Sequence, residues 1–573
     1  MDTCGVLVSC SVSGSDNPVK CSGIRIGRNW ILTTGTILNT ALQATSDQNN
    51  ITSWMKKLGV AFDGCHLTSI QDTQLQKSQM TFTVTTSLEA NPLNQIASKS
   101  SFSIGSLMPV DRKWGIMKPR HRGILWNHQK DVGNPSALAE KHHEVKASLK
   151  YVWRSELISQ SIDTMMSQWI LGSTTSGEED SATEAESYIA KQLLPLFLVL
   201  HIQVDSDENV DQSEINKVLE NLRSICDSNE GILRRGQSVT VESTPFGNYY
   251  FYNSVSDGIV SNVVGPDNCL VLTDARSALG CEGGPIYVTF RRSGRQRRRL
   301  VGMVLCSLSW WRGEWVGFTL GVALRPVLRR LLMPDAPLIN SRSLVPPDTS
   351  QDRLALIDDC VVLVRCGTGW GSGVVVDTRQ GIILTCSHVV RKARNDEVLI
   401  YWKDRRFLAR LLFRSREGRA YDVAVLKAGP GKTFGSAVLS RTEAVKGEPV
   451  VAAGFPLFSE DDNLLPTVTR GVVAHVSDPA AVLQTTCCIQ SGASGGPLFR
   501  HTGELLGIVS CNTLDTDSGA LFPRINMAVP ASVLAVPLYT FLCTGDVHAL
   551  SVMESDDPVV QRLWKLQNVI SKL

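Results

Sequence analysis

The chain has 573 residues, a formal net charge of +2 and a hydrophobic fraction of 43%. This length predicts more than one domain, and the near-neutral charge gives no support for a nucleic-acid partner. No apolar run approaches the roughly 18 residues that a membrane span needs. Residues 1–8 carry an acid where a secretory signal needs basic residues, so we expect a protein that stays inside the cell.

The cysteines are scattered along the chain, without Cys-x-x-Cys pairs and without histidines at zinc-ligand spacing. With no sign of secretion, this pattern favours free and mostly buried thiols over a disulfide framework. We therefore expect no metal site and no cofactor.

The first 40 residues give short β-like runs separated by turn signals. Residues 41–190 are less regular, with a helical stretch expected at about 136–169. An acidic segment rich in Ser and Thr, residues 173–188, is expected to be a solvated loop. Short apolar runs return at 191–330, and the basic run 291–299 joins two of them. We interpret it as a solvated hairpin tip rather than a nucleic-acid patch.

Residues 334–352 hold four prolines among Ser and Asp and predict a linker. The all-β rhythm returns at 355–540. Beyond it, Asp557-Pro558 predicts the start of a C-terminal helix. The chain then ends in Ser571-Lys572-Leu573, a peroxisomal address read by an import receptor.

The chain also repeats itself, since four segments of its first half recur in order in its second half. The pairs are Cys21-Ser-Gly-Ile…Thr36 with Gly371-Ser-Gly-Val…His388, Gly236-Gln-Ser-Val…Phe246 with Gly447-Glu-Pro-Val…Pro456, Gly280-Cys-Glu-Gly-Gly-Pro-Ile286 with Gly492-Ala-Ser-Gly-Gly-Pro-Leu498, and Val301-Gly-Met-Val-Leu-Cys306 with Leu506-Gly-Ile-Val-Ser-Cys511. The offset falls from about 350 residues at the first pair to about 210 later, so the first copy carries a large insertion. We infer two homologous β domains.

Three residues of the second copy have the order and local context of a nucleophilic triad. Ser494 lies in a glycine frame that can expose a hydroxyl and present bare N–H groups. His388 follows the apolar run Ile382-Ile-Leu-Thr385, and Asp422 precedes another. The order His, Asp, Ser is that of a double β-barrel in which both barrels contribute to one cleft. Asp377 and Asp396 are alternative acids, but each lies in a turn signal, so Asp422 is preferred.

These motifs resemble the trypsin-like serine proteases, and more closely the HtrA/Deg branch. The residues that carry the resemblance are Gly371-Ser-Gly-Val, Leu384-Thr-Cys-Ser-His388, Asp422-Val-Ala-Val-Leu and Gly492-Ala-Ser-Gly-Gly-Pro-Leu498. The resemblance implies an all-β fold, a chymotrypsin-like double β-barrel present twice. The expected division is a degenerate copy at 1–333 with an insertion at about 41–190, a linker at 334–352, an active copy at 353–540, and a helix with the targeting tail at 541–573.

The resemblance also implies roles. Ser494 is expected as nucleophile, His388 as base and Asp422 as its orienting acid, with the N–H groups of Gly492 and Ser494 as oxyanion hole. Cys488, six residues before the nucleophile, is the expected floor of the specificity pocket, with Ser510 beside it. A small uncharged floor predicts a small neutral P1 residue.

The sequence departs from secreted trypsin-like enzymes in a residue that concerns activation. Ala493 stands where secreted trypsin-like enzymes have the aspartate that pairs with a freed N-terminus, so we do not expect that activation.

The first copy lacks the same groups. Thr36 stands at the position of His388, Glu282 at that of Ser494, and about Leu196 at that of Asp422. Glutamate cannot run acyl transfer without a base, so we expect this copy to be inactive.

The whole chain resembles a peroxisomal branch of the family, whose members remove N-terminal presequences from imported enzymes and cut after cysteine. We therefore expect a serine endopeptidase of the peroxisomal matrix that acts on precursors of matrix enzymes, without nucleic acid or a membrane span, and able to form homo-oligomers. Self-processing is a further hypothesis, with the exposed loops before residue 190 and the linker near residue 340 as its sites. A quality-control protease of the HtrA type and a non-catalytic scaffold remain alternatives.

Overall fold

The structure is a computed structural model of the chain, and it is built from closed six-stranded β-barrels. The residues described are 4–13, 18–39, 67–70, 80–87, 142–166, 181–203, 212–227, 232–292, 295–311, 314–334, 349–429, 434–457, 465–514 and 521–565. Within these residues the expected all-β architecture, present twice, is confirmed.

The first half of the chain forms two barrels. In the first barrel, the neighbouring strands run β5-β1-β2-β3-β7-β6, the ring closes where β6 pairs with β5, and β4 adds to β6. Its strands are β1 (Cys4–Val12), β2 (Val19–Arg25), β3 (Trp30–Thr34), β4 (Thr68–Ser69), β5 (Met80–Ser87), β6 (His142–Arg154) and β7 (Leu196–Ile202). The strands of the second barrel are β8 (Ser238–Ser243), β9 (Ser254–Val264), β10 (Leu270–Thr273), β11 (Pro285–Arg292), β12 (Arg295–Trp311) and β13 (Glu314–Ala323).

The second half of the chain repeats this plan. Its first barrel contains β14 (Val361–Cys366), β15 (Gly369–Asp377), β16 (Ile382–Thr385), β17 (Glu397–Trp402), β18 (Arg405–Arg414) and β19 (Ala424–Ala428). Its second barrel contains β20 (Pro449–Gly454), β21 (Thr467–Val476), β22 (Leu483–Thr485), β23 (Pro497–Arg500), β24 (Leu505–Leu514) and β25 (Leu521–Pro530).

Strand order shows that the halves are copies. The ring β1-β2-β3-β7-β6-β5 of the first half matches the ring β14-β15-β16-β19-β18-β17 of the second half, strand for strand. The rings β8-β9-β10-β13-β12-β11 and β20-β21-β22-β25-β24-β23 match in the same way. Because strand order is independent of the sequence comparison, it supports the internal repeat directly.

The helices flank the barrels. They are α5 (Glu156–Met165), α6 (Ser181–Leu193), α7 (Gln212–Asp227), α8 (Leu324–Leu332), α9 (Thr349–Cys360), α10 (Ala531–Thr544) and α11 (Pro558–Lys565). Short 3₁₀ turns occupy Gly35–Leu38, Pro245–Gly247, Tyr249–Phe251, Pro266–Asn268 and Val547–Met553. In the part of the chain that is described, no helix combines the length and apolar character that crossing a bilayer requires.

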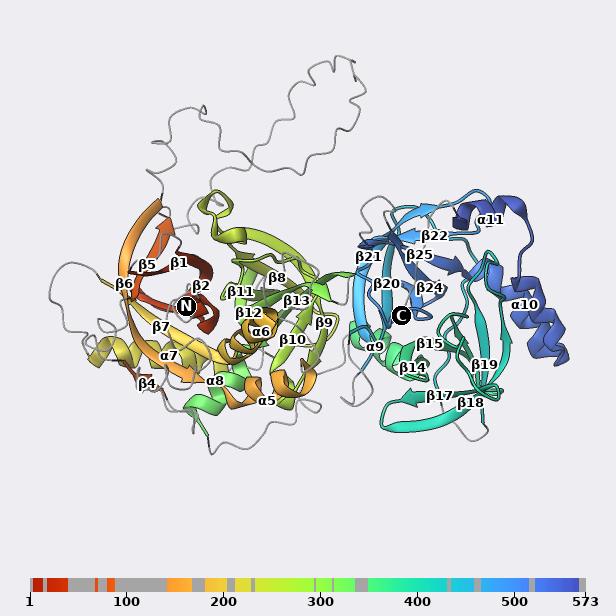
Figure 1. The fold of residues 1–573 in the computed structure, drawn as a ribbon, viewed down its shortest axis with the longest axis horizontal. Helices are drawn as coiled ribbons and strands as arrows, with labels where there is room; N and C mark the ends of the chain where they lie inside the picture. The colour runs from red at the N-terminus through yellow and green to blue at the C-terminus, as the bar shows by residue number, and fades with distance from the viewer. Residues whose placement is uncertain are drawn as a thin grey trace, which may run out of the picture.

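The two halves lie side by side, with β9 and β13 of the first half against β21 and β25 of the second (Figure 1). Buried and partly buried polar bonds cross this junction. Arg235 forms an ion pair with Asp358 and donates to the Pro466 carbonyl at 2.6 Å. Asn262 donates to the Leu465 carbonyl at 2.9 Å. The second barrels of the two copies are therefore joined by specific contacts.

Some local predictions were wrong. Within the stretch expected to be helical, residues 142–154 form strand β6, and only Glu156–Met165 is helix. Residues 181–188, expected in a loop, belong to α6, because Ile189 and Leu193 further along that helix are buried in the first barrel's core. The run from Ala531 to Thr544 is helix α10 rather than strand.

Two other expectations are met at the level of local structure. The basic run is a hairpin of β11 and β12, although Arg298 is not merely solvated: it pairs with Glu242 at 2.8 Å and lies over the Tyr287 ring. Helix α11 begins as predicted, with the Asp557 carboxylate accepting the Val559 N–H at 2.7 Å. Residues 571–573 lie outside the described residues.

Candidate active site

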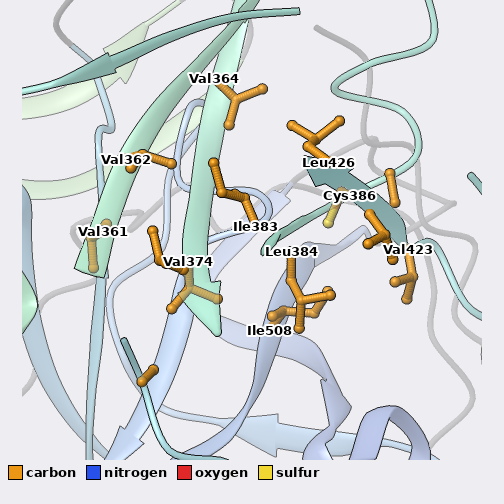
Figure 2. Close-up of a cluster of buried hydrophobic side chains, with 14 of the residues drawn as sticks. Val361, Val362, Val364, Val374, Ile383, Leu384, Cys386, Val423, Leu426 and Ile508 are labelled. Carbon is orange, nitrogen blue, oxygen red and sulfur yellow. The ribbon is translucent and has the colours of Figure 1, made fainter. Parts of the chain in front are cut away.

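Strand pairing brings His388 and Asp422 together. The buried strands β16 and β19 are antiparallel neighbours, with Thr385 opposite Ala424. Their apolar side chains join a buried cluster, drawn in Figure 2, that includes Leu384, Cys386 and Val423. A residue shortly after the end of β16 therefore meets one shortly before β19, and these residues are His388 and Asp422.

The carboxylate of Asp422 holds the histidine at two points. One oxygen accepts the His388 backbone N–H at 3.0 Å, and the other is hydrogen-bonded to ring Nδ1. Ser510 donates its hydroxyl to the same carboxylate at 3.3 Å. Burial would raise the pKa of Asp422, but attraction to His388 and these hydrogen bonds outweigh it and lower the pKa below its usual value. Asp422 is thus an ionised acceptor.

Ser494 lies in a turn between β22 and β23 whose glycines are required by the backbone. Gly492 has φ +95° and Gly495 has φ +84°, conformations that favour glycine. The turn is fastened to the neighbouring barrel by Ser372, whose hydroxyl donates to the Gly492 carbonyl at 2.7 Å. The Ser372 N–H donates to the Ser494 carbonyl at 2.8 Å. Ser494 is therefore held by its main chain, and its side chain is mostly buried.

This turn lies against the segment that carries His388. A Cβ on Gly495 would be 2.4 Å from the Thr385 hydroxyl and 3.0 Å from the backbone nitrogen of Cys386, so the turn and this segment are in close contact. The carbonyl of Val509 accepts both the Gly495 N–H at 2.8 Å and the Cys386 thiol at 3.3 Å. The structure therefore gathers the segments of all three predicted triad residues at one junction between two barrels.

The first copy keeps the same frame. Gly280 and Gly283 have φ +87° and +83°, matching Gly492 and Gly495. Ser22 donates its hydroxyl to the Gly280 carbonyl at 2.8 Å, as Ser372 does in the second copy. The frame is therefore a property of the fold, independent of the side chain it presents.

Glu282 occupies the position of Ser494 in that frame and folds back on it. Its carboxylate accepts the Gly280 N–H at 2.7 Å. Burial raises the pKa of Glu282 to about 7, against the N–H groups of Glu282 and Gly280, which lower it. In the first copy, the N–H that corresponds to that of Gly492 thus binds a carboxylate oxygen.

Register also identifies the other two positions in the first copy. Thr33 pairs with Leu198 as Thr385 pairs with Ala424. Counting on from these pairs places Thr36 at the position of His388 and Leu196 at that of Asp422. The first copy has no histidine or carboxylate there.

Around Cys488, two asparagines define the local geometry. Asn526 donates to the Cys487 carbonyl at 2.8 Å, and Asn512 donates to the Ile489 carbonyl at 3.0 Å. Cys488 and Ser510 are both buried. Sequence reasoning missed both asparagines; the one available signal was an asparagine within an apolar strand, where this residue is uncommon.

Cys386, His388 and Asp422 have ligand-type atoms within 4.8 Å of one another, the kind of group that can bind a metal. The Cys386 thiol, however, donates to the Val509 carbonyl, and burial raises its pKa well above the usual value. Because metals bind the thiolate, this environment disfavours Cys386 as a ligand, and Asp422 is already bonded to His388.

Comparison with known proteins matches residues 371–508 to the trypsin-like peptidase domain. The chain is 33% identical over 440 residues to the peroxisomal leader peptide-processing protease of Homo sapiens, covering 72% of each chain. It is 35% identical over 368 residues to the protein of the same name in Mus musculus, covering 60% of this chain and 62% of the relative.

More distant similarity covers about a third of the chain. A probable periplasmic serine endoprotease, DegP-like, of Buchnera aphidicola is 29% identical over 200 residues, or 31% of this chain and 38% of the relative. A crystal structure of the serine endoprotease from Yersinia pestis covers 35% of this chain and 69% of that chain, at 26% identity and a TM-score of 0.29.

Proposed function

The chain belongs to the family of peroxisomal leader peptide-processing proteases, and from this premise we propose that it is a serine endopeptidase with the triad Ser494, His388 and Asp422. The observation that carries the proposal is the ionised Asp422 bonded to the ring of His388, whose segment lies against the glycine frame of Ser494. General membership in the serine proteases follows from the relatives and the matched domain. The assignment of roles to these residues is our proposal.

In the proposed mechanism, Ser494 Oγ attacks the scissile carbonyl while His388 takes its proton. Asp422 keeps Nδ1 of His388 protonated and stabilises the ring cation. Collapse of the tetrahedral intermediate expels the amine, which takes the proton from His388 and leaves an acyl ester on Ser494. Water, deprotonated by the same histidine, then hydrolyses the ester.

The proposed oxyanion hole consists of the Gly492 and Ser494 N–H groups. Its support comes from the first copy, where the same frame binds a carboxylate oxygen on the N–H of Gly280. A frame whose N–H binds a carboxyl oxygen at the nucleophile position in one copy supports the use of the same donor for a tetrahedral oxyanion in the other.

We propose a small neutral P1 residue, compatible with cysteine. Cys488 is uncharged, and the carboxamides of Asn512 and Asn526 bind the carbonyls on either side of it. These bonds hold the segment against the neighbouring strands, and the Cys488 side chain itself offers no carboxylate to a basic side chain. A fluorogenic peptide series tests this: we expect small neutral P1 residues to be cut best, and preferred cleavage after Arg contradicts it.

Substrates and location are proposed from the relatives' names and the chain's own tail. The named relatives process leader peptides in peroxisomes, and the chain ends in Ser571-Lys572-Leu573. We propose that an import receptor delivers the protein to the peroxisomal matrix, where it cuts precursors of matrix enzymes.

The test compares wild type with Ser494→Ala. A fluorophosphonate probe is expected to label wild type and not the variant, and cells with the variant should accumulate matrix enzymes with unprocessed N-termini. Undiminished labelling of the variant, or no labelling of wild type, overturns the proposal and favours a scaffold.

A quality-control protease is the second candidate, favoured by the similarity to DegP-like proteases. Processing gives one discrete cut in each precursor, whereas degradation gives many fragments. Mass spectrometry of the products of one purified precursor therefore separates the two.

A further inference from the structure

The floor of the proposed specificity pocket is packed against the inactive copy. Cys488 is 2% exposed and belongs to a buried cluster whose other members come mainly from the first half, including Val316 and Phe318 on β13. A hydrogen bond from the Gly317 backbone reaches Cys488; it lowers the pKa of the thiol, which burial raises to about 12. The side chain nearest the P1 residue is therefore partly enclosed by the other half of the chain.

A buried carboxylate of the first half, that of Asp274, contributes to the same junction between the two halves. Asp274 is 3% exposed, and one of its oxygens accepts the backbone N–H of Arg470 on β21 at 3.1 Å. Its other oxygen accepts the Ile259 N–H at 2.7 Å, which anchors it in the first half. The main-chain carbonyl of Asp274 accepts the guanidinium of Arg524 on β25. Asp274 thus joins both copies through main-chain and side-chain bonds.

The strand that carries Arg524 leads directly to the pocket. Two residues after Arg524, the Asn526 carboxamide binds the carbonyl of Cys487, next to Cys488. Arg524 and Asp274 both act electrostatically on Cys487 and Cys488, so the hydrogen bond from Arg524 to the Asp274 carbonyl and the pocket floor occupy one neighbourhood. A shift of β25 away from Asp274 would therefore move the residues that hold the floor.

We propose that the inactive copy positions the specificity pocket of the active copy, with Asp274 and Arg524 as the central pair. The proposal rests on the proposed function of Ser494. Binding sites on loops need a rigid support, and the segment before Ser494 is a loop that receives part of its support from the first half. According to this proposal, the first copy has lost its triad and has kept a surface that shapes the specificity pocket of the second copy.

The proposal predicts that loss of the junction contact affects peptide cleavage and fluorophosphonate labelling differently. A peptide substrate must seat its P1 side chain on Cys488, whereas a fluorophosphonate needs only the activated hydroxyl of Ser494. Loss of the Arg524 contact should therefore raise KM for a peptide with a small P1 residue and leave the labelling rate nearly unchanged. A general loss of folding would reduce both together.

The experiment uses the full chain with Arg524→Ala, Arg524→Lys and Asp274→Asn. Removing a hydrogen bond to a charged group changes affinity by about tenfold or more, so we expect KM to rise about tenfold in Arg524→Ala and less in Arg524→Lys, which keeps a cationic donor. Labelling should stay within about twofold of wild type. Arg410→Ala, an exposed arginine on β18, is the matched control and should resemble wild type.

An unchanged KM in Arg524→Ala overturns the proposal, as does an equal loss of peptide cleavage and labelling in Arg524→Lys and Asp274→Asn. If Arg524→Ala unfolds, those two milder variants decide the question by the same separation of KM from labelling. Failure of the proposed function would instead appear as a wild type that the probe does not label.

Discussion

At the scale of single residues, the two copies of the glycine frame differ in the side chain at the nucleophile position. The glycine turn, the serine that fastens it and the positive φ angles occur in both halves. Ser494 in one copy and Glu282 in the other are presented by the same backbone. In our proposal, activity therefore depends on residues added to the frame, and each of them can be tested by substitution.

Asp422→Asn should lower kcat about 10⁴-fold. The amide cannot stabilise the ring cation of His388, and its NH₂ group favours the wrong tautomer. The variant is measured by peptide hydrolysis. Asp377→Asn is the control, because the Asp377 carboxylate accepts the Gln380 N–H in a turn, and it should keep wild-type activity. Equal loss in both variants would show that Asp422 has no special role.

Glu282→Gln should change how stability depends on pH. The folded pKa of about 7 lies above the ordinary value of about 4.3, so the fold favours the protonated acid. At a pH below the pKa that Glu282 has in the unfolded chain, its carboxyl is neutral in both the folded and the unfolded state. Its titration then makes no contribution to the free energy of unfolding. As pH rises toward 7, the unfolded chain releases the proton more readily, and the wild-type fold loses stability.

The midpoint of thermal unfolding, measured from pH 5 to pH 8, checks this prediction. The midpoint of thermal unfolding of Glu282→Gln should rise relative to that of wild type as pH rises, because the amide of the variant does not titrate. Glu220→Gln, at an exposed position on α7, should show no such trend. A constant difference between Glu282→Gln and wild type across the range would contradict the assignment.

At the scale of elements, the sequence located residues that follow from local pattern and missed those set by distant partners. His388 and Asp422 could be found because each adjoins an apolar strand. Ser372 and Asn512 could not, because their roles depend on carbonyls 120 and 23 residues away. Strand β6 was missed for the same reason: its pairing with β5 and β7 decides its conformation.

Gly495→Ala tests whether the frame depends on its glycines. An alanine there would adopt φ +84° and place its Cβ 2.2 Å from the Ser372 carbonyl. We expect a loss of about 3–5 kcal/mol in the free energy of unfolding, from backbone strain and the clash together, and no fluorophosphonate labelling.

Gly503→Ala separates those two causes. Gly503 also has positive φ, at +99°, but a Cβ there would meet only a Leu356 methyl at 3.5 Å. Strain alone should cost about 1–2 kcal/mol, with labelling retained. Equal losses in the two variants, measured by urea unfolding, would show that the close approach of Gly495 to β15 is unimportant.

At the scale of the whole molecule, the duplication places two second barrels against each other and makes their junction part of the proposed site. Arg235 with Asp358, Asn262 with Leu465, and Asp274 with Arg470 all cross it. Sequence comparison could show that there are two copies, but it could not show how they associate, because similarity between two segments does not tell which of their faces meet.

The halves should therefore stay together after the chain between them is cut. The test inserts a recognition sequence for a site-specific protease within residues 335–348, in a Ser494→Ala background that prevents self-cleavage. After cutting, both halves are expected to elute as one species in size-exclusion chromatography, because buried hydrogen bonds and an ion pair join them. Adding Arg235→Ala, which removes both the pairing with Asp358 and the bond to Pro466, should weaken the association, since it leaves the partly buried Asp358 carboxylate without this partner. Separation of the halves without that substitution would show that the covalent connection alone holds them, and would remove the basis for self-processing that leaves an intact active enzyme.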